Sequence, residues 1–225
     1  MVESSAFPVN IQELIGQREW EISMAFDRMG ASSVDSYPDR HLVYSDSTAG
    51  KVVLPGENLQ LYVGAQSSAG VLFAHEDSTE SKQAILSQLR RDNVTVIICC
   101  CDDGKDGSAY RIFESDGISY AHACLDDGDV DSMAASYIYI EPLLRRALPL
   151  VRAATLRRES VLVHCNSGMH RSASIACAIL MVERNMSLLD AFRSIIKGRV
   201  VCKPTFWRYL LSAEFAALTQ QLNEK

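Results

Sequence analysis

The segment Val94–Cys101 is the sequence feature that most limits the fold. It is almost continuously apolar and ends in three consecutive cysteines. Such a strand is buried on both faces, because a strand with one face in water alternates apolar and polar residues. Helices must therefore cover both sides of the sheet that contains it. This predicts an α/β fold with a central, mainly parallel sheet flanked by helices.

The chain after residue 56 alternates between strand and helix patterns. We expect further strands at 59–63, 118–125 and 161–163. The spacing of apolar residues predicts helices at 81–91, 131–150, 171–184, 190–197 and 206–222. Strands that alternate with helices are typical of parallel βαβ units, which supports the α/β prediction.

An N-terminal segment precedes this pattern. Residues 11–29 carry apolar side chains at helical spacing, and residues 30–50 are rich in Ser and Asp, which is typical of a loop. We therefore divide the chain into an N-terminal helical extension, residues 1–56, and a main domain, residues 57–225. The apolar face of the first helix packs on its own domain in one interpretation, and contacts a partner or a second copy of the chain in the other.

The charge is unevenly distributed along the chain. Residues 1–140 hold 9 Lys and Arg against 22 Asp and Glu, whereas residues 141–208 hold 12 against 4. A basic half in an acidic protein favours a surface that handles anions, although solvated helix faces are an alternative. Nucleic acid is not favoured, because no basic stripe is interleaved with aromatic residues.

Cysteine usage and the chain ends indicate the compartment. Seven cysteines are an odd number, and three of them are adjacent, which does not fit a disulfide framework. The first residues lack the pattern of a secretory signal, and no apolar run reaches the roughly 18 residues of a membrane span. We expect a soluble cytoplasmic or nuclear protein with no membrane partner.

The segment His164–Ser172 carries the chemistry. It lies between a predicted strand and a predicted helix, so its backbone N–H groups can surround an anion at a helix N-terminus. Gly168 permits a sharp turn and a close backbone approach, and Arg171 can hold two phosphate oxygens. The helix dipole and Arg171 favour the thiolate form of Cys165. A thiolate below an anion site can attack phosphorus.

The order His-Cys-x-x-Gly-x-x-Arg-Ser in this segment resembles the signature of the cysteine-dependent protein tyrosine phosphatase superfamily, and the chain is similar to its dual-specificity phosphatases. The stretches 61–65, 186–191 and 204–210 also resemble family segments, although Thr205 replaces the usual Asn. The resemblance covers residues 57–215 and implies a phosphatase-like catalytic domain within 57–225.

The resemblance implies a two-step hydrolysis that needs no metal or other cofactor. Cys165 is the expected nucleophile, Arg171 binds the phosphoryl oxygens, and Ser172 helps the thiolate leave. The substrate-binding residues are then those of the loop: Asn166, Ser167, Gly168, Met169, His170 and Arg171. The family's spacing favours Asp127 as the general acid, because Met133 follows it by six positions, and Asp126 is the alternative.

The expected substrate is a phosphorylated protein. The variable loop positions contain no Lys, which favours a singly phosphorylated site, phosphotyrosine and also phosphoserine or phosphothreonine. The alternative is a catalytically weak phosphoprotein-binding or scaffold module, which would not need the nucleophile.

Two further expectations concern the run Cys99–Cys101. We expect it to belong to the core rather than to a metal site, because adjacent strand residues face opposite ways. We also expect one of these cysteines, or Cys124, to form a protective disulfide with Cys165.

Overall fold

The computed structural model describes most of the chain that follows residue 58 and one N-terminal helix. The described residues are 11–29, 50–51, 59–65, 69, 79–101, 111–123, 125, 133–197 and 206–212. Cys124, Asp126 and Asp127 lie outside them.

A sheet forms the centre of the described part of the chain. Its strands lie in the order β1-β2-β5-β3-β4. Their bounds are β1 (Gly50–Lys51), β2 (Gln60–Gly64), β3 (Val94–Cys99), β4 (Ser119–His122) and β5 (Ser160–His164). Strands β2, β5, β3 and β4 are parallel, and β1 pairs with β2 in the antiparallel sense. The parallel sheet confirms the predicted α/β fold class.

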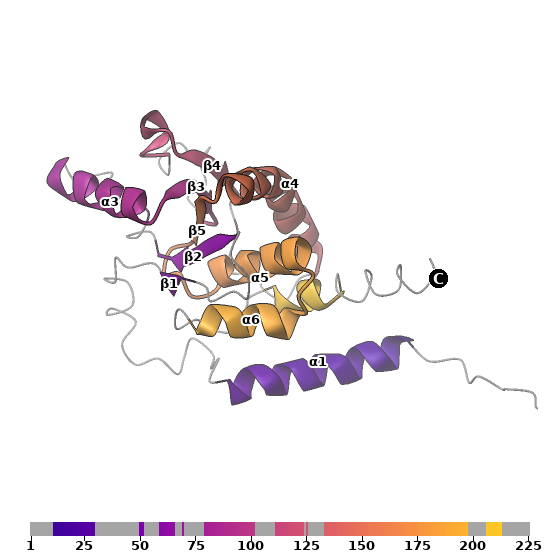
Figure 1. Cartoon of the computed structure of the whole chain (residues 1–225). Helices are drawn as coiled ribbons and strands as arrows, with labels where there is room; N and C mark the ends of the chain where they lie inside the picture. Colours follow the sequence, from indigo (N-terminus) through magenta and orange to yellow (C-terminus); the bar gives the residue numbers. More distant parts are fainter. Residues whose placement is uncertain are drawn as a thin grey trace, which may run out of the picture.

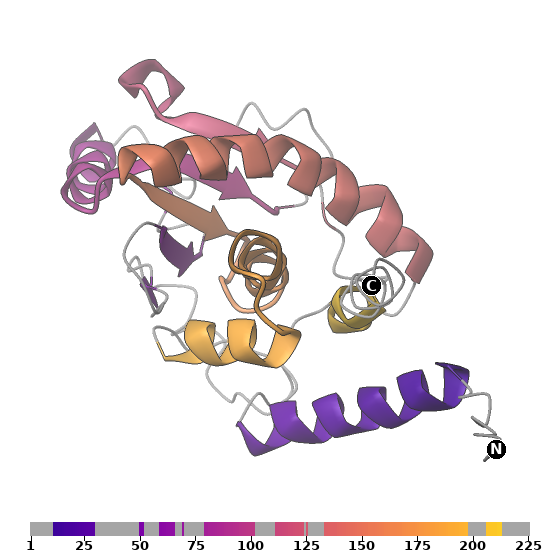
Figure 2. The same ribbon diagram turned by 45° about the vertical axis from the view of Figure 1, so that its right-hand side comes forward.

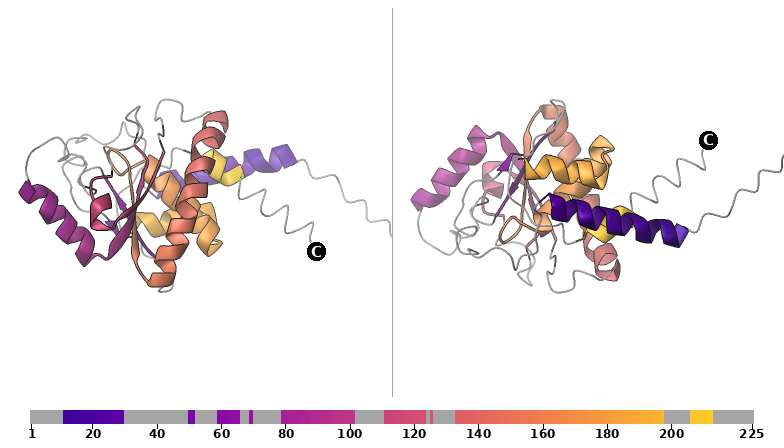
Figure 3. Two further views of the ribbon diagram at one scale, coloured as in Figure 1. Left: turned by 90° about the horizontal axis from the view of Figure 1, so that it is seen from above. Right: turned by 90° about the horizontal axis from the view of Figure 1, so that it is seen from below.

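Helices cover both faces of this sheet, as Figure 1 and Figure 3 show. Helix α3 lies on one face, and α1, α4, α5 and α6 lie on the other. The helices are α1 (Ile11–Arg28), α3 (Thr79–Arg91), α4 (Met133–Arg157), α5 (Arg171–Arg184) and α6 (Leu188–Ile196), with a short 3₁₀ helix at Glu114–Asp116. Residues 207–212 are also helical.

Strand β3 is buried on both faces, as its composition predicted. Val96, Ile98 and Cys100 belong to the apolar cluster that includes residues of α4 and α5. Ile97, Cys99 and Cys101 belong to the cluster on the side of α3. The two clusters divide the core because successive strand residues face opposite sides of the sheet.

Helix α1 packs on the main core through one side. Ile22 and Phe26 are fully buried there, and the Phe26 ring meets the Phe192 ring edge-on with the centroids 4.8 Å apart. Trp20, on the same helix, is 64% exposed. In Figure 2, α1 runs beside α6 and the helical segment 207–212. The described contacts therefore join α1 to the domain that holds the sheet.

Helix α4 and strand β1 differ from the sequence prediction. Helix α4 continues to Arg157 instead of ending near residue 150, and it contains both Pro142 and Pro149. Each proline removes a helical hydrogen bond, but the fully buried inner face of α4 compensates through packing. Strand β1 lies at the end of the segment predicted as loop, because two residues are too few to show an alternating pattern. None of the described helices has the length and apolar character needed to cross a membrane.

Candidate active site

The segment that carries the chemistry links β5 to α5. Val161, Leu162 and Val163 are buried in β5, between β2 and β3. Residues 166–170 form a series of bends, and α5 begins at Arg171. Cys165 stands where the strand ends, 1% exposed. The parallel sheet thus presents this loop at the carboxyl end of a central strand, next to a helix N-terminus, which is where α/β folds bind anions.

Cys165 and Ser172 contact one another at the base of the loop. The Cys165 Sγ lies 3.4 Å from the Ser172 Oγ, and both residues are buried. The Ser172 hydroxyl is within reach to donate a hydrogen bond to the sulfur, and the N-terminus of α5 favours a bound anion nearby. The pair can therefore hold a nucleophilic sulfur below an anion.

Gly168 is required by two features of the loop. Its φ is +72°, a region that residues with a side chain rarely adopt. A Cβ at this position would lie 2.6 Å from the carbonyl carbon and oxygen of Gly64, at the end of β2. The loop therefore packs directly on the backbone of the neighbouring strand, and this contact fixes its position relative to the sheet.

Arg171 connects the loop to the segment that carries the expected general acid. Its side chain is 4% exposed, and its Nη1 donates a hydrogen bond of 2.8 Å to the Leu125 carbonyl oxygen. Leu125 immediately precedes Asp126 and Asp127 in the chain. Since both aspartates lie outside the described residues, the choice between them stays a prediction.

The remaining loop residues differ in their burial. Asn166, Ser167 and His170 are partly buried, and Met169 is buried together with Gly168. The end of the loop is held by Ser174, whose N–H and hydroxyl both donate to the His170 carbonyl oxygen, at 3.0 and 3.1 Å. These contacts give the loop a fixed connection to the first turn of α5.

Two further cysteines lie in the same apolar cluster as Cys165, namely Cys100 and Cys177. Burial raises the pKa of both thiols. Charge on the neighbouring Cys165 and Cys101 raises the pKa of Cys100 further, and Arg171 opposes this effect. Both therefore remain neutral thiols near pH 7, and both lie on the same side of the sheet as Cys165.

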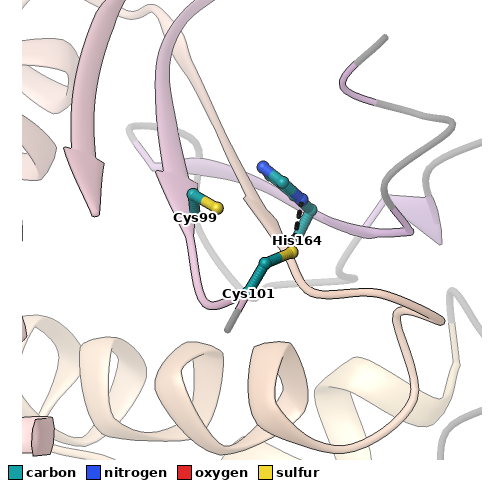
Figure 4. Close-up of side chains that lie close together, drawn as sticks. All are labelled: Cys99, Cys101 and His164. Atoms are coloured by element: carbon teal, nitrogen blue, oxygen red, sulfur yellow. Dashed lines mark hydrogen bonds between the residues drawn. The ribbon is translucent and has the colours of Figure 1, made fainter. Parts of the chain in front are cut away.

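One group of three side chains was not predicted from the sequence. The side chains of Cys99, Cys101 and His164 converge between β3 and β5 (Figure 4), with their ligand-type atoms all within 4.8 Å of one another. The cysteine run belongs to the core, as predicted, since all three cysteines are fully buried. The expectation that its side chains could not converge is wrong for two of them. Alternation turns Cys100 away but leaves Cys99 and Cys101 on one face, and the register pairs Cys99 with His164. A sequence signal for this group was present. It consists of two cysteines at positions i and i+2 of one strand, next to a parallel strand that ends in His.

Comparison with known proteins identifies the family. The sequence model of the dual specificity phosphatase catalytic domain matches residues 78–215. Human dual specificity protein phosphatase 21 is 31% identical over 102 residues, which are 44% of this chain and 50% of that protein. Mouse dual specificity protein phosphatase 13B is 29% identical over 92 residues, 41% of this chain and 43% of that protein. The chain thus spans about half the length of these curated relatives.

Solved structures agree with this result. The crystal structure of a variant of human DUSP28 aligns with a TM-score of 0.53 and 26% identity, over 76% of this chain and 97% of that one. A mouse putative dual specificity phosphatase aligns with a TM-score of 0.52 and 24% identity, over 72% and 86% of the two chains, which shows the shared fold. Because the family model covers more than half of the 225 residues, the chain belongs to the dual specificity phosphatase family.

Proposed function

We propose that the chain is a cysteine-dependent protein phosphatase that hydrolyses phosphotyrosine, and also phosphoserine and phosphothreonine, through a cysteinyl-phosphate. The observation that carries this proposal is the contact between Cys165 Sγ and Ser172 Oγ at 3.4 Å, below a loop that enters the N-terminus of α5. Family membership supports the same chemistry.

In the first step, the Cys165 thiolate attacks phosphorus, an S–P bond forms, and the bond from phosphorus to the ester oxygen breaks. Asp127, or its neighbour Asp126, donates a proton to the leaving oxygen. The hydrogen bond from Arg171 to the Leu125 carbonyl supports this role, because it ties the segment just before the aspartates to the loop. Arg171 and the loop amides stabilise the charge on the phosphoryl oxygens.

In the second step, water attacks phosphorus and the S–P bond breaks, which releases inorganic phosphate. The aspartate carboxylate accepts the proton from water. The Ser172 hydroxyl donates a hydrogen bond to the sulfur as it leaves, which its distance from Cys165 allows. The nucleophile, the anion site and the acid are all protein groups, so no step in this scheme assigns a task to a metal ion.

The loop composition supports a singly phosphorylated protein as substrate. Asn166, Ser167, Met169 and His170 add no ammonium group that could bind a second phosphate. The cytoplasm is the compartment that suits this chemistry, because a reducing environment keeps Cys165 as a thiol.

Turnover of an aryl phosphate tests the proposal. Cys165→Ser should lower kcat by more than about 10³-fold, because it removes the nucleophile, and it should still bind a phosphotyrosine peptide. Cys177→Ala is the matched control, since it removes a fully buried thiol that the scheme does not use. Vanadate should inhibit, and EDTA in the assay should leave the initial rate unchanged. If Cys165→Ser and the parent chain both bind the peptide and neither turns it over, the chain is a phosphoprotein-binding module instead.

A further inference from the structure

The group Cys99, Cys101 and His164 lies on the opposite side of the sheet from Cys165. Cys99 and Cys101 belong to the apolar cluster beside α3, whereas Cys165 belongs to the cluster that includes residues of α4 and α5. The proposed reaction uses none of the three side chains. All three residues are fully buried. Two thiols and an imidazole thus lie together in an apolar layer, without a role in the proposed reaction.

Their arrangement follows from the sheet register. Cys99 is the register partner of His164 on the adjacent parallel strand β5, and Cys101 follows on the same side two residues later. The Cys101 Sγ lies 3.8 Å from the His164 Nδ1. Figure 4 shows the two sulfurs and the imidazole turned toward one region between the strands.

We propose that Cys99, Cys101 and His164 form a binding site for a zinc ion, with one sulfur from each cysteine and the Nδ1 or Nε2 of the histidine as ligands. Zinc bonds of about 2.3 Å to sulfur and about 2.0 Å to nitrogen place tetrahedral ligands about 3.8 Å apart for two sulfurs and about 3.5 Å apart for sulfur and nitrogen. Since the three ligand atoms already lie within 4.8 Å of one another, small side-chain rotations bring them to these separations.

The donor set also determines the class of metal. Thiolate and imidazole ligands select zinc over magnesium or calcium, which require oxygen ligands. Two thiolates balance the charge of a divalent zinc ion, so the loaded site is neutral. A neutral group can be buried among apolar residues such as Ile97 and Leu162 without the cost of an isolated charge.

The backbone around the ligands is already fixed. The Cys100 N–H donates a hydrogen bond of 2.8 Å to the His164 carbonyl oxygen, which holds the ends of β3 and β5 together. The His122 Nε2 lies 3.3 Å from the Cys101 carbonyl oxygen. Ligands held by such outer contacts lose less freedom when the metal binds. A zinc ion here would link β3 to the residue that immediately precedes Cys165, and so would brace the active-site loop from behind.

Metal content of the full chain tests the site without relying on turnover. The chain is produced in zinc-supplemented medium in a Cys165→Ser background, so that the proposed nucleophile contributes no ligand, and is then passed over a chelating resin. We expect about one zinc per chain by mass spectrometry of the metal, and loss of that zinc in Cys99→Ser and in Cys101→Ser. Cys100→Ser is the matched control, because it changes the residue between them, which faces the other side, and it should keep the zinc.

Cobalt(II) gives a second measurement that needs no variant of the cluster. Cobalt added to the metal-free chain should produce a thiolate-to-cobalt charge-transfer band and the visible bands of a tetrahedral ion, and zinc should abolish both. Zinc at about 100 times its dissociation constant should also raise the unfolding midpoint by about 5–10 °C. The proposal is overturned if the chain retains no zinc and gives no charge-transfer band. It is equally overturned if the variants at Cys99 and Cys101 bind metal as the control does.

Discussion

Replacing Gly168 with alanine should damage catalysis more than stability. The new Cβ would meet Gly64 backbone atoms at 2.6 Å, whereas ordinary contacts begin at 3.4 Å, so the loop must move by about 0.8 Å. Strand β2 cannot yield easily, because Gly64 is paired with His164 in the sheet. The positive φ of +72° adds about 1–2 kcal/mol of backbone strain. A displacement near 1 Å of catalytic groups costs about 10²-fold, which is the expected loss in kcat/KM.

The assay for Gly168→Ala is kcat/KM on an aryl phosphate, together with urea unfolding. Gly117→Ala is the matched control, because Gly117 also has a positive φ, of +88°, but nothing lies within 4 Å of its added Cβ. The control should lose about 1–2 kcal/mol of stability and keep its kcat/KM. If Gly168→Ala keeps kcat/KM within about threefold of the parent chain, the close contact with Gly64 does not position the loop.

Three other changes test separate parts of the account. Asp127→Asn should lower turnover by about 10²–10⁴-fold on phosphotyrosine but much less on an aryl phosphate with an acidic phenol, and it should remove the basic limb of the pH–rate profile. Asp126→Asn should lower turnover equally on both substrates. If the two variants behave the other way round, the general acid is Asp126. Phe26→Ala should lower the free energy of unfolding in urea by about 3 kcal/mol, because Phe26 is fully buried against Phe192. Trp20→Ala, on the exposed side of α1, should change it by less than about 0.5 kcal/mol. Equal effects of the two variants would mean that α1 does not pack as described. Mild peroxide should oxidise Cys165 to a sulfenic acid and release water. The Cys100 thiol, which lies on the same side of the sheet, should then form a disulfide with Cys165 and release a second water, and peptide mapping detects this bridge. A bridge to Cys99 or Cys101, or overoxidation of Cys165 alone, would contradict Cys100 as the partner.

Local patterns were enough to predict the strand–loop–helix unit at the centre of the site. The apolar run 161–163 lies within β5, and helix α5 has the predicted bounds, Arg171–Arg184. These elements depend on neighbouring residues: an apolar run, a glycine at the turn and a stretch of small helix-forming residues. The buried strand β3 was predictable for the same reason, because an apolar run of that length has no polar face to expose to water.

Contacts between distant segments could not be predicted in this way. The hydrogen bond from Arg171 to the Leu125 carbonyl depends on where β4 ends relative to α5. The group formed by Cys99, Cys101 and His164 depends on the pairing of β3 with β5, which a single sequence does not reveal. Strand β1 is too short to carry a pattern, and α4 extends past its predicted end because burial, rather than helix propensity, sets its length.

Direct observation of phosphate on the Cys165 sulfur is the measurement that tests the central claim. Ser172→Ala removes the hydroxyl 3.4 Å from that sulfur, so the second step should slow more than the first and the intermediate should accumulate. Mixing this variant with an aryl phosphate should release a burst of about one phenol per chain, and rapid denaturation followed by peptide mass spectrometry should place one phosphate on Cys165. Steady turnover without a burst, or phosphate attached to any other residue, would contradict the account.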